Sequence, residues 1–305
     1  MLDRWGQFLL HRGLQYNTRM PESLSNKNEK IPATAGAFLE KLRAGEAIPE
    51  DSKVAVVVAH QDDESIAFGG QISRFPGCMM VHVTDGAPED PKEWQAKGFE
   101  SQAAYADVRN REVNTALDIA GHTGPRESLN VTDQKVALQL AESAKTLATL
   151  FIKQGTKFAL THAYEGGHPD HDAVTFAVHA AKELMKQENL TLTIIEAPLY
   201  RREGSESVWQ QFVPMEGTQE FALELNDEQR ALKPQLFTAQ PSQGKVFGHI
   251  SMDTERLRAA PEYDFRQPAN GGNLSHIFAD AGLAESWTTL TDQALKSLRL
   301  TKPTM

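Results

Sequence analysis

The feature that most constrains this chain is an unbroken apolar run that ends in a cluster of polar side chains. Residues 54–64 read VAVVVAHQDDE, so six valines and alanines precede a histidine, a glutamine and three carboxylates. A continuous valine-rich run is typical of a strand that a sheet buries on both faces. Charged groups at the end of such a strand are costly to bury unless they bind something. The stretch therefore predicts a ligand site at the carboxyl end of a buried strand, where open α/β sheets bind their ligands.

Segments typical of strands and helices alternate along the next 140 or so residues. The pattern predicts strands over residues 53–59, 78–84, 127–131, 157–161 and 192–196. Between them it predicts helices over residues 65–74 and 104–120, a helix capped by Thr132 and Asp133 that runs to Phe151, and a helix over 170–186. This repeated order predicts an α/β fold with a mostly parallel sheet and helices on both faces.

The pattern weakens after residue 200. It predicts short strands over 209–212, 221–225 and 246–250, a helix over 227–237 that Pro234 interrupts, a loop over 262–273 and a last helix over 284–298. We expect a single α/β domain of 305 residues, with a helical arm over 1–50, a core over 53–200 and a less regular C-terminal extension over 201–305 that completes the substrate site. In the arm, residues near Trp5 and Leu10 predict a short helix, and residues 34–44 predict another.

Charge and composition exclude several classes of protein. The net charge of −10 argues against nucleic acid or an anionic membrane as the main partner. The chain has one cysteine, Cys78, in an apolar run, so we expect a buried thiol and no internal disulfide. No apolar run approaches the ~18 residues of a membrane span, and the first residues lack the pattern of a signal peptide, so a cytoplasmic location is predicted. Nucleotide-binding glycine motifs, G-x-S-x-G and H-E-x-x-H are all absent from the sequence.

A second polar cluster, THAYEGGHPDHD, fills residues 161–172. It follows a predicted strand and opens a predicted helix, and Pro169 suits the first helical turn. His168 and His171 lie three residues apart across this junction, so both can face one site. Two imidazoles with one carboxylate are a ligand set that leaves positions open for water and substrate. Together, the two clusters predict a divalent metal site.

These motifs resemble the PIG-L/LmbE family of zinc-dependent de-N-acetylases. HQDDE at residues 60–64 and GGHPDHD at 166–172 occur in the family's order, and the segment around Arg109, the TDG of residues 84–86 and Lys233 with residues 242–243 are also similar. The usual first motif is A-H-P-D-D-E, so Gln61 replaces a proline here. The similarity covers about residues 53–245. It implies a Rossmann-like fold and hydrolysis of N-acetylglucosaminyl groups by attack of a zinc-bound water on the amide.

The resemblance also implies a role for each matching residue. The implied zinc ligands are His60, Asp63 and His171. The implied catalytic residues are Asp62 as the general base, His168 as the group that stabilises the oxyanion and protonates the leaving amine, and Asp170 as the residue that orients His168. The residues expected near the substrate are Arg109, Asp85 and Tyr164. The implied cofactor is Zn2+, although the same ligands accept Fe2+ or Co2+.

Alternatives stay open at this point. The carboxylates of residues 62–64 could cap a helix, Asp85 could be an ordinary turn aspartate, and Arg109 could be a surface residue. His82, inside a predicted strand, is expected to be a core histidine. For function, the favoured partner is a small N-acetylated sugar. The rivals are an amidase of the same fold that cleaves a larger acyl group and a sugar-binding protein without turnover. The sequence leaves homo-oligomer formation open.

Overall fold

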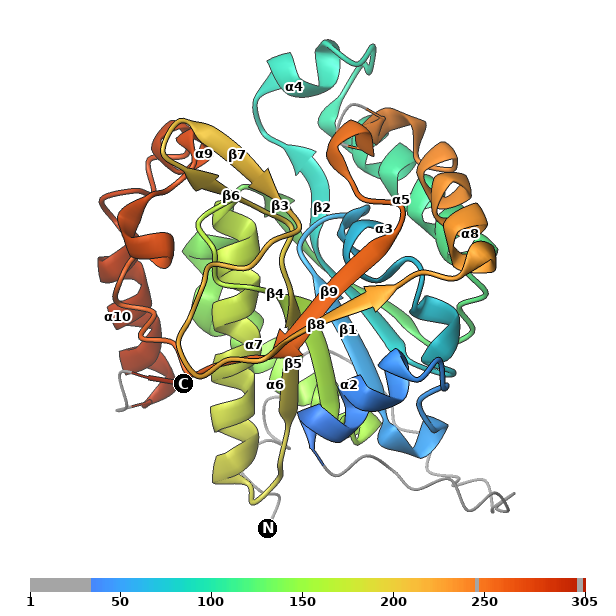
Figure 1. The fold of residues 1–305 in the computed structure, drawn as a ribbon. Helices are drawn as coiled ribbons and strands as arrows, with labels where there is room; N and C mark the ends of the chain where they lie inside the picture. Colours follow the sequence, from blue (N-terminus) through green and yellow to red (C-terminus); the bar gives the residue numbers. More distant parts are fainter. Residues whose placement is uncertain (1–33, 245–246, 301–303) are drawn as a thin grey trace. The chain divides into compact units, whose positions relative to one another are not determined.

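A seven-stranded sheet with the order β3-β2-β1-β4-β5-β9-β8 organises this computed structural model (Figure 1). The model describes residues 34–244, 247–300 and 304–305, so the helix predicted near Trp5 and Leu10 lies outside the described residues. The strands, in sheet order, are β3 (Arg126–Asp133), β2 (Met79–Pro88), β1 (Val54–Val58), β4 (Phe158–His162), β5 (Thr193–Ala197), β9 (Thr254–Ala259) and β8 (Glu220–Glu224).

The first five strands of this order run parallel, and β9 runs antiparallel to both of its neighbours. The predicted mostly parallel α/β fold is therefore confirmed.

Side chains of the central strand alternate between two cores, one on each face of the sheet. Val54, Val56 and Val58 pack with one core, whereas Ala55 and Val57 pack with the other. Because successive strand residues point to opposite faces, an all-apolar strand requires cover on both sides. Helices provide it.

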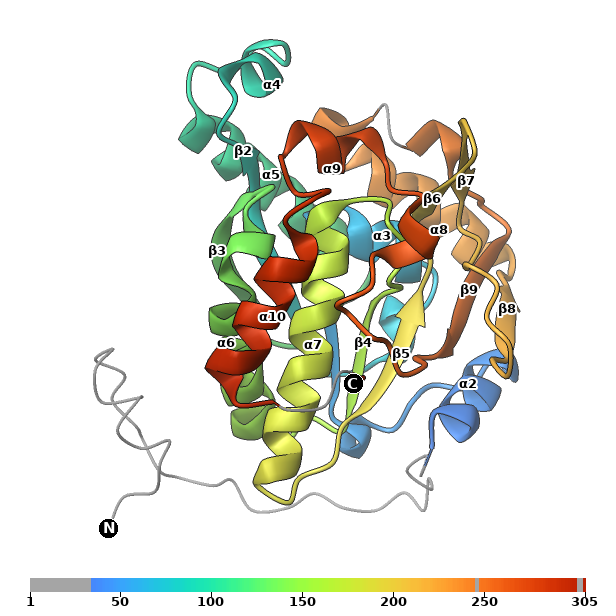
Figure 2. The same cartoon turned by 90° about the vertical axis from the view of Figure 1, so that its left-hand side faces the viewer.

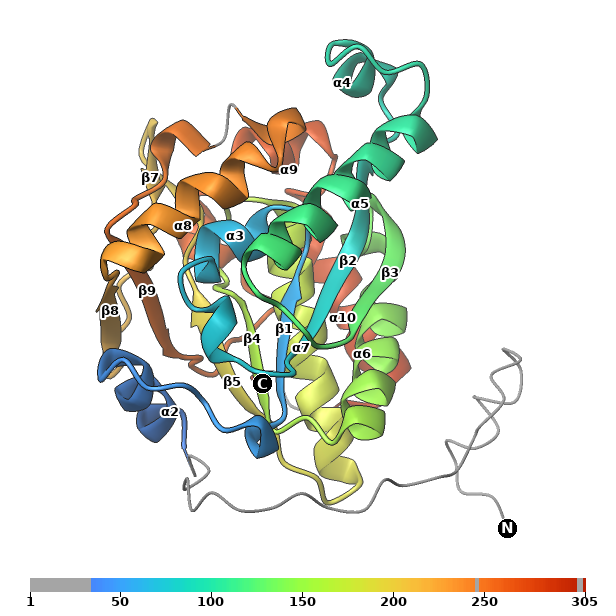
Figure 3. The same ribbon diagram turned by 90° about the vertical axis from the view of Figure 1, so that its right-hand side faces the viewer.

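The first core is covered by α2 (Ala35–Arg43), α3 (Asp63–Phe68), α5 (Gln102–Ile119) and α8 (Asp227–Thr238), as Figure 3 shows. The second is covered by α6 (Leu140–Gln154), α7 (Pro169–Gln187) and α10 (Trp287–Leu298), as Figure 2 shows.

The chain reverses its direction of travel across the sheet between β1 and β4. From β1 it adds β2 and β3 on one side, and then β4 and β5 on the other. Such a switch point leaves a crevice at the carboxyl ends of the two central strands. Both polar motifs follow these two strands, so the fold brings residues 60–64 and 166–172 to the same place.

Several predicted elements differ from the observed ones. The helix predicted over 65–74 ends at Phe68 and resumes as a 3-10 turn at Ile72–Arg74. Thr132 and Asp133 do not cap a helix, because β3 extends to Asp133 and a 3-10 turn (Val136–Gln139) precedes α6. The strand predicted over 246–250 is wrong, since Phe247–His249 form a 3-10 turn. Pro234 lies inside α8 without ending it.

The remaining short elements lie near the carboxyl edge of the sheet or after residue 198. The short helix α4 (Pro91–Gln95) lies between β2 and α5, and a hairpin of β6 (Tyr200–Glu203) and β7 (Glu206–Trp209) replaces the strand predicted over 209–212. The last short helix is α9 (His276–Asp280). None of the helices that the model describes has the length and apolar character needed to cross a membrane.

Candidate metal and catalytic site

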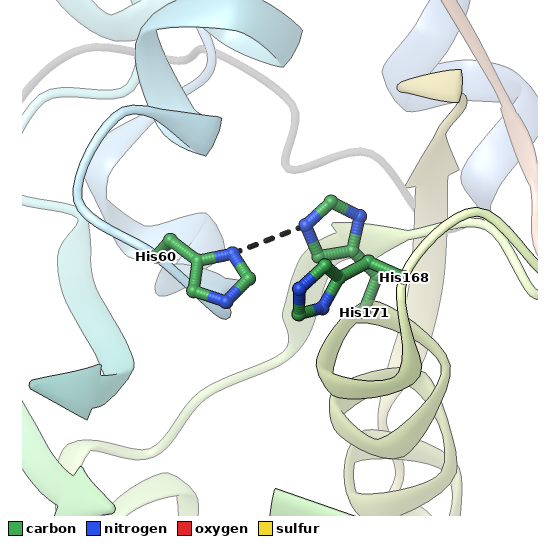
Figure 4. Close-up of side chains that lie close together, drawn as sticks. All are labelled: His60, His168 and His171. Atoms are coloured by element: carbon green, nitrogen blue, oxygen red, sulfur yellow. Dashed lines mark hydrogen bonds between the residues drawn. The ribbon is translucent and has the colours of Figure 1, made fainter. Parts of the chain in front are cut away.

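Three side chains from the two motifs form a small triangle, in which Asp63 presents a different carboxylate oxygen to each histidine. His60 Nδ1 lies 3.2 Å from His171 Nε2 and 3.4 Å from Asp63 Oδ2, and His171 Nε2 lies 3.4 Å from Asp63 Oδ1. Figure 4 shows the His60 and His171 rings turned toward each other. A tetrahedral zinc with ligand bonds of 2.0–2.1 Å needs donor separations of about 3.4 Å. The donor set and its spacing therefore fit the implied metal.

The local backbone explains how neighbouring residues reach this triangle. After β1 the chain turns so that the His60 N–H donates to Asp63 Oδ2 over 2.7 Å, and Asp63 then begins α3. On the other side, His168 is the N-cap of α7 and Pro169 fills its first position. His171 follows within the first turn and points back toward His60.

Two further carboxylates orient His60. Its Nε2 lies 3.2 Å from Asp133 Oδ1 and 3.3 Å from Asp170 Oδ2, so this nitrogen carries a proton and Nδ1 faces the triangle. Burial lowers the pKa of His60, but Asp133 and the other nearby carboxylates outweigh it and raise the pKa well above its usual value. Burial raises the pKa of Asp63, yet His171 and His162 hold it well below its usual value.

A fourth buried histidine is excluded as a ligand by its hydrogen bond. His162 Nε2 accepts the Ala59 N–H over 2.8 Å, so its lone pair is occupied although it lies 3.5 Å from Asp63. Its ring stacks on that of His171, with centroids 4.2 Å apart and an angle of 1° between the planes. His162 therefore supports the ring of His171 from behind.

Asp62 lies beside the triangle and pairs with Arg109. Arg109 Nη2 lies 3.1 Å from Asp62 Oδ1 and also donates to the Gln61 carbonyl, while Nη1 donates to the Gly86 carbonyl over 2.7 Å. Burial raises the pKa of Asp62 to about 6, against the lowering effect of Arg109. Arg109 is thus a buried part of the site, and the alternative of a surface residue does not hold.

His168 faces His60, with ring centroids 4.6 Å apart. Its Nδ1 accepts the backbone N–H of Asp170 over 3.1 Å, so the neutral ring carries its proton on Nε2. The carboxylate of Asp170 forms no hydrogen bond with His168 among the described residues. It accepts from the backbone N–H groups of Gln134 and Val136 and approaches His60. The contact between Asp170 and His168 is therefore made by the main chain of Asp170 and not by its carboxylate.

Asp133 belongs to the site but was not predicted to. It ends β3, borders the cavity and contacts His60. Asp85 fixes it, because Asp85 Oδ1 accepts the Asp133 N–H over 3.1 Å and the Ala87 N–H over 2.9 Å. Asp85 itself does not border the cavity, so its geometry matches the turn aspartate that the sequence left open. No motif marks Asp133; only its place at a parallel strand end could have drawn attention to it.

The residue that departs from the family motif has a definite role. Gln61 Nε2 donates to the Thr84 carbonyl over 2.7 Å, a bond from the turn after β1 to β2 that a proline could not make. Gly86 leaves room for this side chain: its φ is +70°, and an added Cβ would lie 2.1 Å from Gln61 Oε1. The substitution is therefore accommodated at both positions.

A cavity of about 230 Å³ opens over these residues. Six of the predicted site residues border it: His60, Asp62, Asp63, Arg109, His168 and His171. Tyr164 does not, since its hydroxyl donates to the Gln267 carbonyl over 2.8 Å and its ring packs among aromatic side chains of the core. Tyr200, which the sequence did not indicate, borders the cavity instead.

Of the more distant motif residues, Gln243 reaches the cavity but Lys233 does not. Lys233 is fully buried and donates to Glu255 over 2.8 Å and to the Ile66 carbonyl over 3.0 Å. His82 is also structural, as predicted, with its Nε2 3.0 Å from Glu64 Oε2. Glu64 therefore turns away from the metal triangle and into the core.

Comparison with known proteins gives one family and a set of structures. The family model described as PIG-L, GlcNAc-PI de-N-acetylase, matches residues 55–182. A deacetylase of the teicoplanin biosynthesis pathway is 15% identical, with a TM-score of 0.53 over 68% of this chain and 96% of that chain. The A40926 pseudoaglycone deacetylase Dbv21 is 14% identical, with a TM-score of 0.52 over 68% and 96%.

An N,N'-diacetylchitobiose deacetylase from Pyrococcus horikoshii is 19% identical, with a TM-score of 0.48 over 72% of this chain and 84% of that chain. No curated protein matches the sequence significantly. At these identities, the teicoplanin and A40926 structures show that the fold is shared.

Proposed function

From the PIG-L family domain that residues 55–182 form, we propose that this protein is a zinc-dependent hydrolase that removes the acetyl group from an N-acetylated amino sugar. The observation that carries the proposal is the triangle of His60, Asp63 and His171 beside the buried pair of Asp62 and Arg109. All five side chains border the same cavity, so a substrate bound there would lie close to each of them.

The three donors would hold the metal, with Asp133 and Asp170 fixing the ring of His60. A zinc ion bound there would polarise the amide carbonyl and lower the pKa of a water molecule. Asp62 is not a member of the triangle and borders the cavity, so it is free to take a proton from the water that attacks the amide carbon.

His168 supplies the hydrogen bond to the oxygen that becomes negative. Its Nε2 carries the proton because Nδ1 is occupied by the Asp170 N–H. A neutral imidazole donor of this kind stabilises an oxyanion without losing its own proton. The resemblance assigns the proton of the leaving nitrogen to His168, but a neutral imidazole is a weak acid. We propose instead that this proton comes from Asp62, which received one from water. The C–N bond breaks, and acetate and a free amine leave.

An amidase that cleaves a larger acyl group remains the second candidate, because the cavity adjoins a larger hollow. That hollow measures about 780 Å³ and shares Glu93, Lys97 and Gln243 with the cavity. A larger acyl group would have space there. The binding-protein alternative is less well supported, since all the residues that we propose as ligands and base border one cavity.

Amine release from N-acetylated compounds tests the proposal. The panel contains N-acetylglucosamine, N,N'-diacetylchitobiose, and N-acetylglucosamine linked to inositol or malate, each with metal-stripped and zinc-restored protein. Zinc-restored release from any member supports the proposal. If the protein binds zinc but releases amine from no compound, the amidase is favoured. If it binds no metal and turns over no compound, the binding protein is favoured. A cytoplasmic location and self-association remain predictions beside this one.

A further inference from the structure

We propose that Trp209 is a stacking platform for a second ring of the substrate, so that the preferred substrate is a neutral glycoside of at least two rings. The inference rests on the proposed function and adds the substrate class. Trp209 ends β7 and borders the cavity, although it lies outside the family domain of residues 55–182. The family match therefore assigns no role to Trp209.

A row of neighbouring aromatic rings extends outward from the metal triangle. The Tyr200 ring lies 5.5 Å from that of His171, the Trp209 ring 5.0 Å from Tyr200, and the His249 ring 4.9 Å from Trp209 at an angle of 11°. Both Tyr200 and Trp209 border the cavity. Trp209 thus lies one ring farther from the reacting centre than Tyr200, where the second residue of a substrate would lie.

The hairpin that carries these rings is firmly attached. Tyr200 and Trp209 are partners across the β6–β7 ladder. Glu165 Oε1 accepts the Tyr200 N–H over 3.0 Å, and Gly167 lies so close that an added Cβ would be 1.9 Å from the Tyr200 carbonyl oxygen. The side chain of Gln210 donates to the Ile66 carbonyl and accepts the Ser251 N–H. A platform held in place loses little freedom when a ligand binds.

The chemistry of this wall matches a sugar ring. A pyranose has an apolar face of C–H groups and a polar rim, and an indole offers an apolar face with one N–H donor. His249 stacks on one side of the indole, and the Trp209 N–H donates to no residue that the model describes. The Tyr200 ring lies tilted against the indole at 40°, yet Trp209 is only partly buried and borders the cavity. The indole therefore keeps an exposed part and a donor for a ligand there.

Charge in the cavity argues for a neutral substrate. Arg109 is engaged by Asp62 and by two backbone carbonyls, and Lys97 at the rim donates to the Ser242 carbonyl. Four carboxylates also border the cavity: Asp62, Asp63, Glu93 and Asp133. Among the described lining residues, these four carboxylates outnumber the side chains of Arg109 and the exposed Lys97, so a second neutral ring suits the site better than an anionic group.

The test compares one-ring and two-ring substrates on matched variants. We would measure kcat/KM for N-acetylglucosamine and N,N'-diacetylchitobiose with the wild type, Trp209→Ala, Trp209→Phe and Ser207→Ala, all loaded with zinc. Ser207 is exposed on the same strand and does not border the cavity, so it is the control. We expect Trp209→Ala to lower kcat/KM for the two-ring substrate on the order of tenfold and for the one-ring substrate clearly less. Trp209→Phe should recover most of the loss.

Equal losses for both substrates in Trp209→Ala, or no loss, would overturn the proposal. If no compound is turned over at all, the proposed function has failed, and calorimetric titration still decides the platform. In that case the two sugars are titrated into the same variants. Weaker binding of the two-ring sugar alone in Trp209→Ala supports stacking, and unchanged binding rejects it.

Discussion

At the scale of single residues, the site depends on which nitrogen of each imidazole is free. The Nε2 of His60 contacts two carboxylates, and its Nδ1 faces the metal triangle. The Nε2 of His162 instead accepts a backbone N–H, so this histidine is not a candidate ligand. The Nδ1 of His168 accepts a backbone N–H, so its Nε2 remains a hydrogen-bond donor. Hydrogen bonds to the surrounding chain therefore divide chemically identical side chains among different tasks.

Asp62→Asn should separate metal binding from turnover. The amide cannot accept a proton from water, so kcat should fall by roughly 10²–10⁴ while zinc content stays near one per chain, because Asp62 is outside the triangle. Amine release and metal analysis of the same sample measure both quantities. Unchanged activity would remove Asp62 from the role of general base.

Asp133→Ala should weaken metal binding. Loss of the carboxylate 3.2 Å from His60 Nε2 leaves that ring less firmly oriented, and such changes typically cost roughly 10–100-fold in metal affinity. Competition with a chelator of known affinity measures the change, and Asp118→Asn, an exposed aspartate outside the cavity, is the control. Equal zinc affinity in Asp133→Ala and wild type would contradict this account of His60.

At the scale of elements, buried ion pairs hold the antiparallel part of the sheet to the rest. Lys233 of α8 meets Glu255 of β9, and the same carboxylate accepts the Gly70 N–H after α3. Lys233→Met should destabilise the fold by about 3–5 kcal/mol, because it leaves Glu255 buried without its partner. Urea unfolding measures the loss. The double variant Lys233→Met with Glu255→Gln should recover part of it, and a double variant no more stable than the single one would argue against an ion-pair effect.

Glu196 of β5 should make stability depend on pH. Burial raises its pKa to about 7, against the lowering effect of Arg258, with which it pairs across β5 and β9. A carboxyl whose pKa rises on folding contributes stability below its unfolded pKa and loses it as pH rises through the folded value. The free energy of unfolding of the wild type relative to Glu196→Gln should therefore fall between about pH 4.5 and 7, by at most about 1.4 kcal/mol per pH unit. A difference that rises over this range would contradict the assignment.

The sequence predicts the parallel half of the fold well because each of its strands is buried on both faces. The all-apolar residues 54–59 and the two motifs indicate β1, β4 and the place where they meet. It misses Asp133, because an aspartate before a helix looks like a cap, and only the register of β3 on β2 puts it beside His60. Tyr200 and β9 were missed for a similar reason: edge strands and hairpins take their place from tertiary contacts, which short polar segments do not encode.

At the scale of the whole molecule, the metal should tie the two motifs together. The zinc that we propose to be held by His60 and Asp63 after β1 and by His171 in α7 should favour the folded chain over the unfolded one. At a zinc concentration 100 times Kd the gain is about 2.7 kcal/mol, enough to raise Tm by several degrees. Thermal unfolding with zinc, with chelator and with His171→Ala tests this. An equal rise in the His171→Ala variant would mean that zinc acts elsewhere.

The position of the two motifs at the centre of the sheet has a consequence for how such a protein can change. The proposed ligands and base lie between β1 and the start of α3 and in α7, whereas α4 and the β6–β7 hairpin supply part of the outer wall. Exchange of residues 200–209 for another hairpin would leave every donor atom of the triangle in its own element. Substrate specificity could therefore change, in evolution or in the laboratory, through replacement of this hairpin while the residues proposed for the chemical step stay the same.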